Sequence, residues 1–220
     1  MNAPGLMRYF EQNFASVSKY VPHDTAILRI ADLGGICGAF YLDTTFLPNN
    51  AENIQIAINR VRNELNLGTD SVVLYGASKG GTGALYHAVK GHYRCVAVDP
   101  IVADEHYITS YGDLHFTETG AFPRSKENVF TELVSELDNL PSPLAATRWS
   151  VILSDRSPQH KYLSRTLVDR TDRLFSFFES RHPAIKDHPD VGPNTVNTAT
   201  ALMNFHLYSI PVTTGTFVID

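Results

Sequence analysis

The sequence predicts an α/β fold, a three-layer sandwich in which a mostly parallel and shortened sheet lies between layers of helices. Short apolar runs alternate along the chain with segments of helical apolar spacing, as in repeated strand–helix–strand units. Three of these runs end directly at a glycine cluster or an aspartate, at Gly76, Asp99 and Asp155. Repetition of this order predicts parallel strands with helices on both faces of the sheet.

Each element follows from a local pattern. Apolar residues recur at helical spacing at Ile54, Ile58, Val61 and Leu65, which predicts the first helix. The run around Phe175 predicts a strand, although a helix is an alternative there. The expected strands are 26–31, 71–75, 94–98, 149–154 and 174–178, with an edge strand in 211–219; the expected helices are 52–65, 79–90, 127–137, 161–168 and 194–207.

The chain of 220 residues has the length of one domain, so we expect a single domain over 1–220. The segment 101–143 is largely irregular apart from its helix. Segments of this length between strands often cover an active site, so we expect a lid-like insertion there. The polar, proline-rich stretch 181–193 is expected to be a loop that precedes the last helix.

Composition excludes several classes of function. A hydrophobic content of 43% and a charged content of 19% are typical of a globular protein. The net charge of −5 and scattered basic residues argue against a nucleic-acid partner. No apolar run is long enough to span a bilayer, and residues 1–10 lack the pattern of a signal peptide. A cytoplasmic location is therefore expected.

The two cysteines, Cys37 and Cys95, lie in apolar surroundings. We expect both to be small buried residues in a reducing compartment. Neither has a histidine at metal-ligand spacing, so no metal site is expected, and no resident cofactor is predicted either.

The segment Gly76-Ala77-Ser78-Lys79-Gly80 fits the pattern Gly-x-Ser-x-Gly, in which a serine is exposed on a sharp strand-to-helix turn. The pattern alone is weak, but here four strand-forming residues precede it and a helical pattern follows it. A phosphate-binding loop is the alternative, although the Gly-x-x-x-x-Gly-Lys-Ser/Thr spacing is absent. The context favours Ser78 as a catalytic nucleophile, as in the α/β-hydrolase fold.

A nucleophilic serine needs a base, and the base needs an acid that orients it. In this type of fold the order along the chain is serine, acid, histidine. Asp155 follows a predicted strand and is the preferred acid, with Asp99 as the alternative. Among nine histidines, His188 and His182 follow the last main strand, and His188 is preferred.

An oxyanion hole commonly combines the amide after the nucleophile with an amide from a loop after an earlier strand. The first is here the amide of Lys79. The glycine-rich segment after residue 31 offers the second, from Leu33 or Gly34. The Lys79 side chain is expected to be solvated, although it is also a candidate for binding an anionic substrate group.

The segment 73–86, Val-Leu-Tyr-Gly-Ala-Ser-Lys-Gly-Gly-Thr-Gly-Ala-Leu-Tyr, resembles the elbow of XcbB/CpsF-type capsular polysaccharide biosynthesis proteins. Weaker similarity extends over about 25–205. The resemblance implies an α/β-hydrolase fold with a Ser-Asp-His triad and acyl chemistry on a polysaccharide or its precursor. It also implies further N-terminal strands, which are either absent here or on another chain.

The leading hypothesis is a serine-dependent esterase or O-acyltransferase in surface polysaccharide biosynthesis, with a glycan or small-molecule substrate and an acyl donor such as acetyl-CoA. Water as the acyl acceptor gives hydrolysis, and a sugar hydroxyl gives transfer. A non-catalytic binding or assembly component that keeps the elbow is the first alternative. A phosphate-binding domain that uses the helix after Ser78 is the second.

Overall fold

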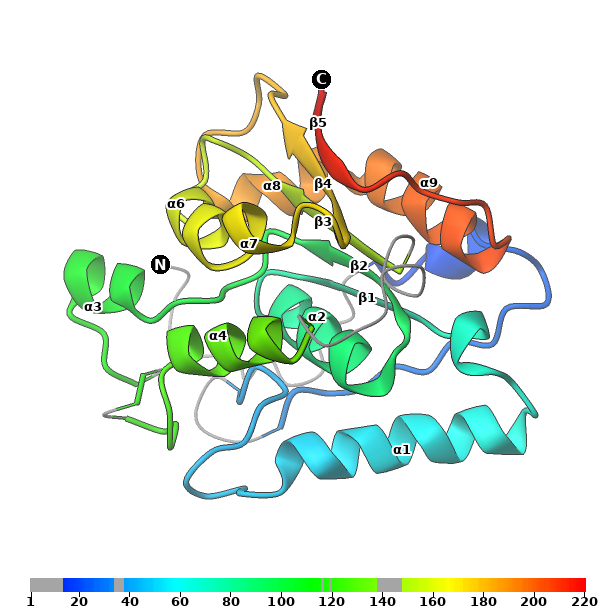
Figure 1. Ribbon diagram of the computed structural model, residues 1–220, viewed down its shortest axis with the longest axis horizontal. Coiled ribbons are helices and arrows are strands. Elements are labelled where there is room, and N and C mark those ends of the chain that lie inside the picture. The colour runs from blue at the N-terminus through cyan, green and yellow to red at the C-terminus, as the bar shows by residue number, and fades with distance from the viewer. Residues whose placement is uncertain (1–13, 34–37, 116, 119, 138–147) are drawn as a thin grey trace.

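A computed structural model describes residues 14–33, 38–115, 117–118, 120–137 and 148–220 (Figure 1). Within these residues, five strands form one all-parallel sheet in the order β1-β2-β3-β4-β5. The strands are β1 (Val73–Ala77), β2 (Arg94–Val98), β3 (Trp149–Leu153), β4 (Phe175–Ser180) and β5 (Gly215–Ile219). The predicted α/β class with a mostly parallel sheet and flanking helices is confirmed.

The strands send alternate side chains to opposite faces of the sheet, as the pleat requires. In β2, Cys95 and Ala97 face one hydrophobic core, whereas Val96 and Val98 face another. All four side chains are almost fully buried. Both faces of a parallel sheet are covered, so its strands read as continuous apolar runs in the sequence.

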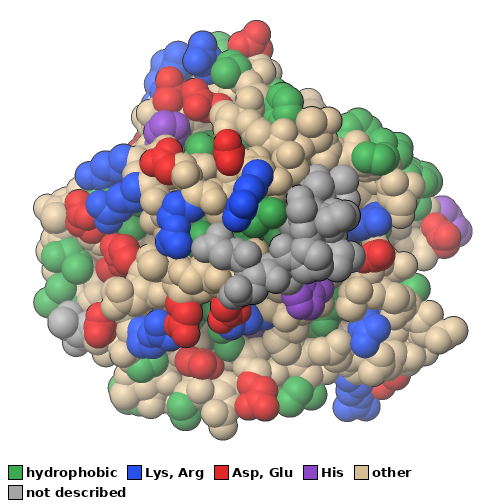
Figure 2. Space-filling view, viewed as in Figure 1, with side chains coloured by type: hydrophobic (Ala, Val, Ile, Leu, Met, Phe, Trp, Pro, Cys, Tyr) green, Lys and Arg blue, Asp and Glu red, His purple; other side chains and the backbone are tan. Residues whose placement is uncertain are grey.

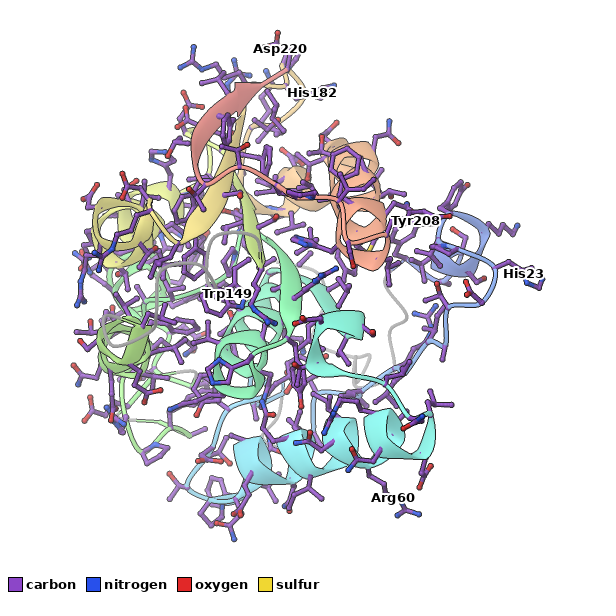
Figure 3. All side chains as sticks on the ribbon, turned by 45° about the vertical axis from the view of Figure 1, so that its right-hand side comes forward. His23, Arg60, Trp149, His182, Tyr208 and Asp220 are labelled. Carbon is purple, nitrogen blue, oxygen red and sulfur yellow. The ribbon has the colours of Figure 1, made fainter. Side chains whose placement is uncertain are left out.

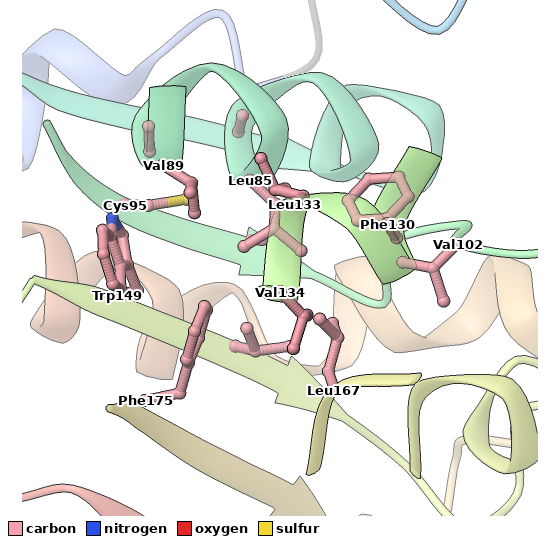
Figure 4. Packing of buried hydrophobic residues seen from close by; sticks show 14 of the residues in the cluster. Leu85, Val89, Cys95, Val102, Phe130, Leu133, Val134, Trp149, Leu167 and Phe175 are labelled. Atoms are coloured by element: carbon pink, nitrogen blue, oxygen red, sulfur yellow. The ribbon is translucent and has the colours of Figure 1, made fainter. Parts of the chain in front are cut away.

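The larger core lies under three helical segments. The first two are α2 (Lys79–Gly91) and α4 (Lys126–Leu137). In the third, α6 (His160–Leu163) continues through the π-helical turn η4 (Ser164–Val168) into α7 (Asp169–Thr171). Figure 4 shows side chains from α2, α4 and η4 meeting those of β2, β3 and β4. The apolar face of α4 is therefore part of the core. Within the described part of the expected lid, α3 (Glu105–Tyr111) and the segment 112–115 are partly or fully exposed, and residues 138–143 lie outside the described residues.

The smaller core lies on the opposite face, under α8 (His188–Asn194) and α9 (Val196–Leu207). In Figure 1 these two helices lie on the other side of the sheet from α2 and α4, while α1 (Asn50–Glu64) forms an outer layer against α2. Two short 3₁₀ turns, η2 (Val17–Lys19) and η3 (Thr69–Ser71), complete the described elements.

The expected first strand, 26–31, does not join the sheet. Ile27 and Leu28 are exposed, and the Arg29 guanidinium donates to the carbonyl oxygen of Ala15. Only Ile30 of this run packs against the larger core. The run has strand-like composition, but no described strand pairs with it, so β1 forms one edge of the described sheet.

The expected loop 181–193 is also shorter than predicted, because α8 already begins at His188. Asp187 caps this helix: its carboxylate accepts from the first amide of the helix, and Asp190 bonds back to the amide of Asp187. Such reciprocal capping starts a helix even where Gly192 and Pro193 suggest a loop. This early start places His188 at the first position of a helix.

Cys95 is a free, fully buried cysteine, as expected, and burial raises the pKa of its thiol. Cys37 lies outside the described residues. Basic and acidic side chains are interspersed on the face seen in Figure 2, with no broad area of one sign. Among the helices that the structure describes, none has the length and apolar character needed to cross a membrane.

One buried histidine makes stability depend on pH. His206 of α9 is buried, its Nε2 lies 2.9 Å from the Ser150 hydroxyl, and its pKa is lowered to about 4, first by burial and then by the charge of Arg94. Between about pH 6.5 and 4 the unfolded chain therefore binds a proton that the folded chain excludes. The free energy of unfolding should fall by roughly 3 kcal/mol as pH decreases through this window.

Urea unfolding at pH 7.5 and at pH 4.5 measures this effect. We expect His206→Gln to flatten the pH dependence relative to the wild type, and His23→Gln, a change at an exposed histidine (Figure 3), to leave it unchanged. An equally steep decline in His206→Gln would assign the pH dependence to other groups.

Candidate functional site

Three polar residues meet at the carboxyl ends of neighbouring strands. Ser78 follows β1, Asp99 follows β2, and His188 begins α8, which lies against the second face of the sheet. Because β1 and β2 are parallel and adjacent, their carboxyl ends lie side by side. Loops at this edge are the usual position of binding sites in open α/β sheets.

The turn at Ser78 is a sharp strand-to-helix elbow. Ser78 has φ 56° and ψ −124°, a backbone conformation rarely adopted by residues other than glycine. The surrounding structure holds this conformation through two backbone bonds: the Ser78 amide donates to the carbonyl oxygen of Val98 at 2.9 Å, and the Ser78 carbonyl accepts from the Thr82 amide at 3.0 Å. The hydroxyl is thereby fixed above the end of the sheet.

The glycines of the elbow have unequal roles. A Cβ atom at Gly76 would overlap the carbonyl group of Gly80, so this position requires glycine. A Cβ atom at Gly80 would meet nothing within 4 Å, whereas one at Gly81 would lie only 3.0 Å from the carbonyl oxygen of Val98. On the helix side of the elbow the tight approach is therefore at Gly81, one residue after the second glycine of the Gly-x-Ser-x-Gly pattern.

Ser78, His188 and Asp99 form a continuous chain of hydrogen bonds. Ser78 Oγ lies 2.7 Å from His188 Nε2, and His188 Nδ1 lies 2.6 Å from Asp99 Oδ2. A carboxylate can only accept, so Nδ1 carries the proton and Nε2 is left to accept from the serine hydroxyl. This tautomer is the one required of a histidine that acts as a base toward Ser78.

The carboxylate beside His188 belongs to Asp99, which was the alternative, and not to Asp155, which was preferred. Asp155 is exposed, in the turn after β3, one strand farther from Ser78 than β2 is. Asp99 is buried, has a left-handed backbone with φ 43°, and donates its amide to the carbonyl oxygen of Ile152 at 2.7 Å. The carboxylate that contacts His188 therefore follows the strand directly next to the elbow.

His182, the alternative to His188, lies elsewhere. It follows β4 in a tight turn, where its Nδ1 accepts from the Ala184 amide at 3.3 Å. Figure 3 shows it close to the C-terminal Asp220, and the neighbouring Arg181 amide bonds to the carbonyl oxygen of Ile219 in β5. The hydrogen bond to Ser78 is made by His188 alone of these two.

The Lys79 amide is the first of α2, directly after Ser78, so it lies at the positive end of the helix dipole. Leu33 is exposed, and Gly34 lies outside the described residues. The expected second oxyanion donor therefore stays a prediction.

The Lys79 side chain is one-third exposed, and its Nζ lies 3.3 Å from Oδ2 of the buried Asp32. The Asp32 carboxylate also accepts from the consecutive amides of Ala39, Phe40 and Tyr41 at 2.9–3.1 Å. Lys79 thus partly neutralises a buried carboxylate that folds the segment after residue 37 back toward the elbow. The expectation of a simply solvated lysine missed this ion pair.

Helix α3 adds aromatic side chains near the site. Tyr107 is largely buried, and its pKa is raised, first by burial and then by acidic and tyrosine neighbours that include Asp99. Burial lowers the pKa of His106, and neighbouring His188 and Lys161 lower it further, against the effect of Asp187. His106 is therefore neutral near pH 7 and adds no charge beside His188.

A comparison with protein-family models gives no match, and a comparison with curated proteins gives none either. Two solved structures are similar to the chain at a distant level. The first is the Glycosylation Associate Protein (Gap123) complex from Streptococcus agalactiae, with a TM-score of 0.48 and 16% identity. The second is the capsule O-acetyltransferase of Neisseria meningitidis serogroup A, with a TM-score of 0.40 and 17% identity.

The matches cover 79% and 84% of this chain. They cover 35% of the Gap123 chain and 61% of the acetyltransferase chain, so this chain spans only part of either protein. Identity and TM-score at this level describe a distant similarity in fold, and the chemistry of the chain must be argued from its own residues.

Proposed function

We propose that this chain is a serine-dependent esterase or O-acyltransferase that works through an acyl-enzyme on Ser78. The observation that supports this most is the chain of short hydrogen bonds from Ser78 Oγ through His188 to Asp99, on a strained elbow at the start of a helix. Nucleophile, base and orienting acid in this geometry serve acyl transfer on several unrelated folds.

In the first half-reaction, Ser78 Oγ attacks the carbonyl carbon of an ester or thioester, and its proton passes to His188 Nε2. The imidazolium that forms is stabilised by the Asp99 carboxylate at Nδ1. The carbonyl oxygen becomes an oxyanion, for which the Lys79 amide is the nearest helix N-terminal donor in sequence. Collapse of the tetrahedral intermediate breaks the bond to the leaving group, which takes the proton from His188.

The second half-reaction returns Ser78 to its free form. His188 accepts a proton from the acceptor while the acceptor oxygen attacks the acyl carbon. The bond from that carbon to Ser78 Oγ then breaks, and Ser78 Oγ takes the proton back from His188. Water gives a carboxylic acid, and a sugar hydroxyl gives an acylated sugar. The sequence resemblance around Ser78 supports a bacterial surface glycan or its precursor as the substrate, with an acyl donor such as acetyl-CoA.

Labelling with a fluorophosphonate tests the nucleophile directly. The serine oxygen displaces fluoride at phosphorus, leaving a stable adduct that mass spectrometry locates. Trypsin releases Ser78 in the peptide 63–79, which also contains Ser71. We expect fragmentation to place the adduct on Ser78. An adduct on Ser71, or no adduct on the folded protein, would overturn the proposal.

Incubation with p-nitrophenyl acetate then separates the two outcomes for the acyl group. We expect a burst of p-nitrophenol close to one equivalent, followed by turnover that depends on the acceptor. Faster turnover with added oligosaccharide, together with acetylated sugar product, would indicate transfer. A rate that is insensitive to sugars, with acetate as the product, would indicate hydrolysis.

A further inference from the structure

The turn after β3 contacts the carboxylate of Asp99. Ser157, the last residue of the turn 154–157, donates its hydroxyl to Asp99 Oδ2 at 2.5 Å. The same oxygen receives the Nδ1 proton of His188 at 2.6 Å. One carboxylate oxygen thus has two short hydrogen bonds, one to the histidine and one to Ser157, which makes no hydrogen bond to Ser78 within the described part of the chain.

Two further hydrogen bonds of Ser157 fix the orientation of its hydroxyl. Its oxygen accepts from the Gln159 amide at 3.2 Å, which leaves the proton to point at the carboxylate. The Ser157 amide donates to the carbonyl oxygen of Ser154 at 3.0 Å, which closes the turn. Ser157 is 4% exposed, so water does not compete freely for the hydroxyl.

The orientation of the Asp99 carboxylate depends strongly on its hydrogen bond to Ser157. Its side chain is 2% exposed, and its other oxygen, Oδ1, is buried with no hydrogen-bond partner among the described residues. A buried carboxylate needs hydrogen bonds to remain charged, and bonds to a charged group are stronger than neutral ones. Without Ser157, the carboxylate would keep only His188 and would be free to turn about its terminal bond.

The same turn also holds the segment that leads to His188. The Arg156 guanidinium donates to the carbonyl oxygens of Pro183 and Ile185 at 3.2 and 3.3 Å. The Ser154 hydroxyl donates to the carbonyl oxygen of Ser180, at the end of β4, at 2.7 Å. One short turn therefore fixes both the acid and the backbone that places the base.

We propose that Ser157 is a positioning residue for the reaction, which holds the Asp99 carboxylate in the plane needed by His188. This inference rests on the proposed function. Ser157 acts through Asp99 and does not touch the reacting atoms. Its loss should lower the rate of chemistry at Ser78 while leaving the binding of a small reagent unchanged.

A double-mutant cycle with Asp99 tests this role. We measure the maximal fluorophosphonate labelling rate, and the reagent concentration that gives half of it, for Ser157→Ala, Asp99→Ala and the double variant. Ser157→Ala should lower the maximal rate about 10- to 100-fold, the range expected for loss of one hydrogen bond to a charged group. In the Asp99→Ala background the same change should have no further effect, because the group that Ser157 positions is gone.

Asp155→Ala is the matched control, since Asp155 is an exposed neighbour in the same turn. Urea unfolding shows whether each variant is folded. Should Ser157→Ala unfold, Ser157→Cys places a slightly larger side chain with a weaker donor at the same position, and its rate should still fall several-fold. The low-field proton resonance of His188 Nδ1 should move in the Ser157 variants and stay in place in Asp155→Ala.

The outcomes separate this inference from the proposed function. Labelling of Ser157→Ala at the wild-type rate, while Ser78→Ala is unlabelled, would overturn the role of Ser157 alone. An equal fall in both the wild-type and Asp99→Ala backgrounds would also overturn it, because Ser157 would then act independently of Asp99. A wild-type protein that is not labelled at all would overturn both.

Discussion

Replacement of Ser78 with alanine is expected to abolish fluorophosphonate labelling and to lower p-nitrophenyl acetate turnover by more than about 10⁴-fold. The variant keeps the fold but lacks the oxygen that attacks. His188→Ala should cost nearly as much, because Ser78 then has no base within 2.7 Å to take its proton. The double variant should be no worse than either single one, because the two residues act as a unit.

His182→Ala is the control for this experiment, since His182 has the same side chain and follows the same strand. We expect it to label at the wild-type rate. Labelling that survives in Ser78→Ala would exclude Ser78 as the nucleophile. Normal labelling in His188→Ala with loss in His182→Ala would reassign the base against the hydrogen-bond geometry.

Much of the fold follows from local patterns in the sequence. The predicted strand 94–98 has the bounds of β2, because its run of buried residues ends abruptly at Asp99-Pro100. The predicted helix 127–137 differs from α4 by one residue, because its apolar spacing matches one helical face. The bounds of such segments follow from the local sequence alone.

One failure arises where long-range contacts decide, and another where a local capping motif does. The run 26–31 has the composition of a strand, but whether it pairs depends on residues far away in the chain, and it does not join the sheet. At His188, the capping bonds between Asp187 and Asp190 outweigh the loop-forming tendency of Gly192 and Pro193. The capping pattern of Asp187 and Asp190 is visible in the sequence.

Part of the candidate site can be predicted from the sequence in the same way. Ser78 lies in a motif with a mechanical reason, and His188 follows from its place after the last main strand predicted, which corresponds to β4. Ser157 offers no such signal, because a serine in a turn is common and its partner lies 58 residues away. The usual order of strands favours Asp155 as the acid, whereas the carboxylate that bonds to His188 follows the strand next to the elbow.

The second prediction tests whether Asp99 or Asp155 is the acid that orients His188. Asp99→Asn is expected to lower the labelling rate and esterase turnover by about 10³- to 10⁴-fold, while Asp155→Asn leaves both unchanged. The asparagine has nearly the same shape, but its amide group can donate to Nδ1. The histidine proton would then move to Nε2, which could no longer accept from Ser78.

Both substitutions remove one negative charge, so a general electrostatic effect would appear in both variants. Only Asp99 is buried and bonded to His188 at 2.6 Å, and Asp155 faces solvent. Steady-state kinetics with p-nitrophenyl acetate, beside labelling at saturating reagent, measures the difference. A loss confined to Asp155→Asn would restore the acid expected from strand order, and it would mean that His188 turns away from Asp99 when substrate binds.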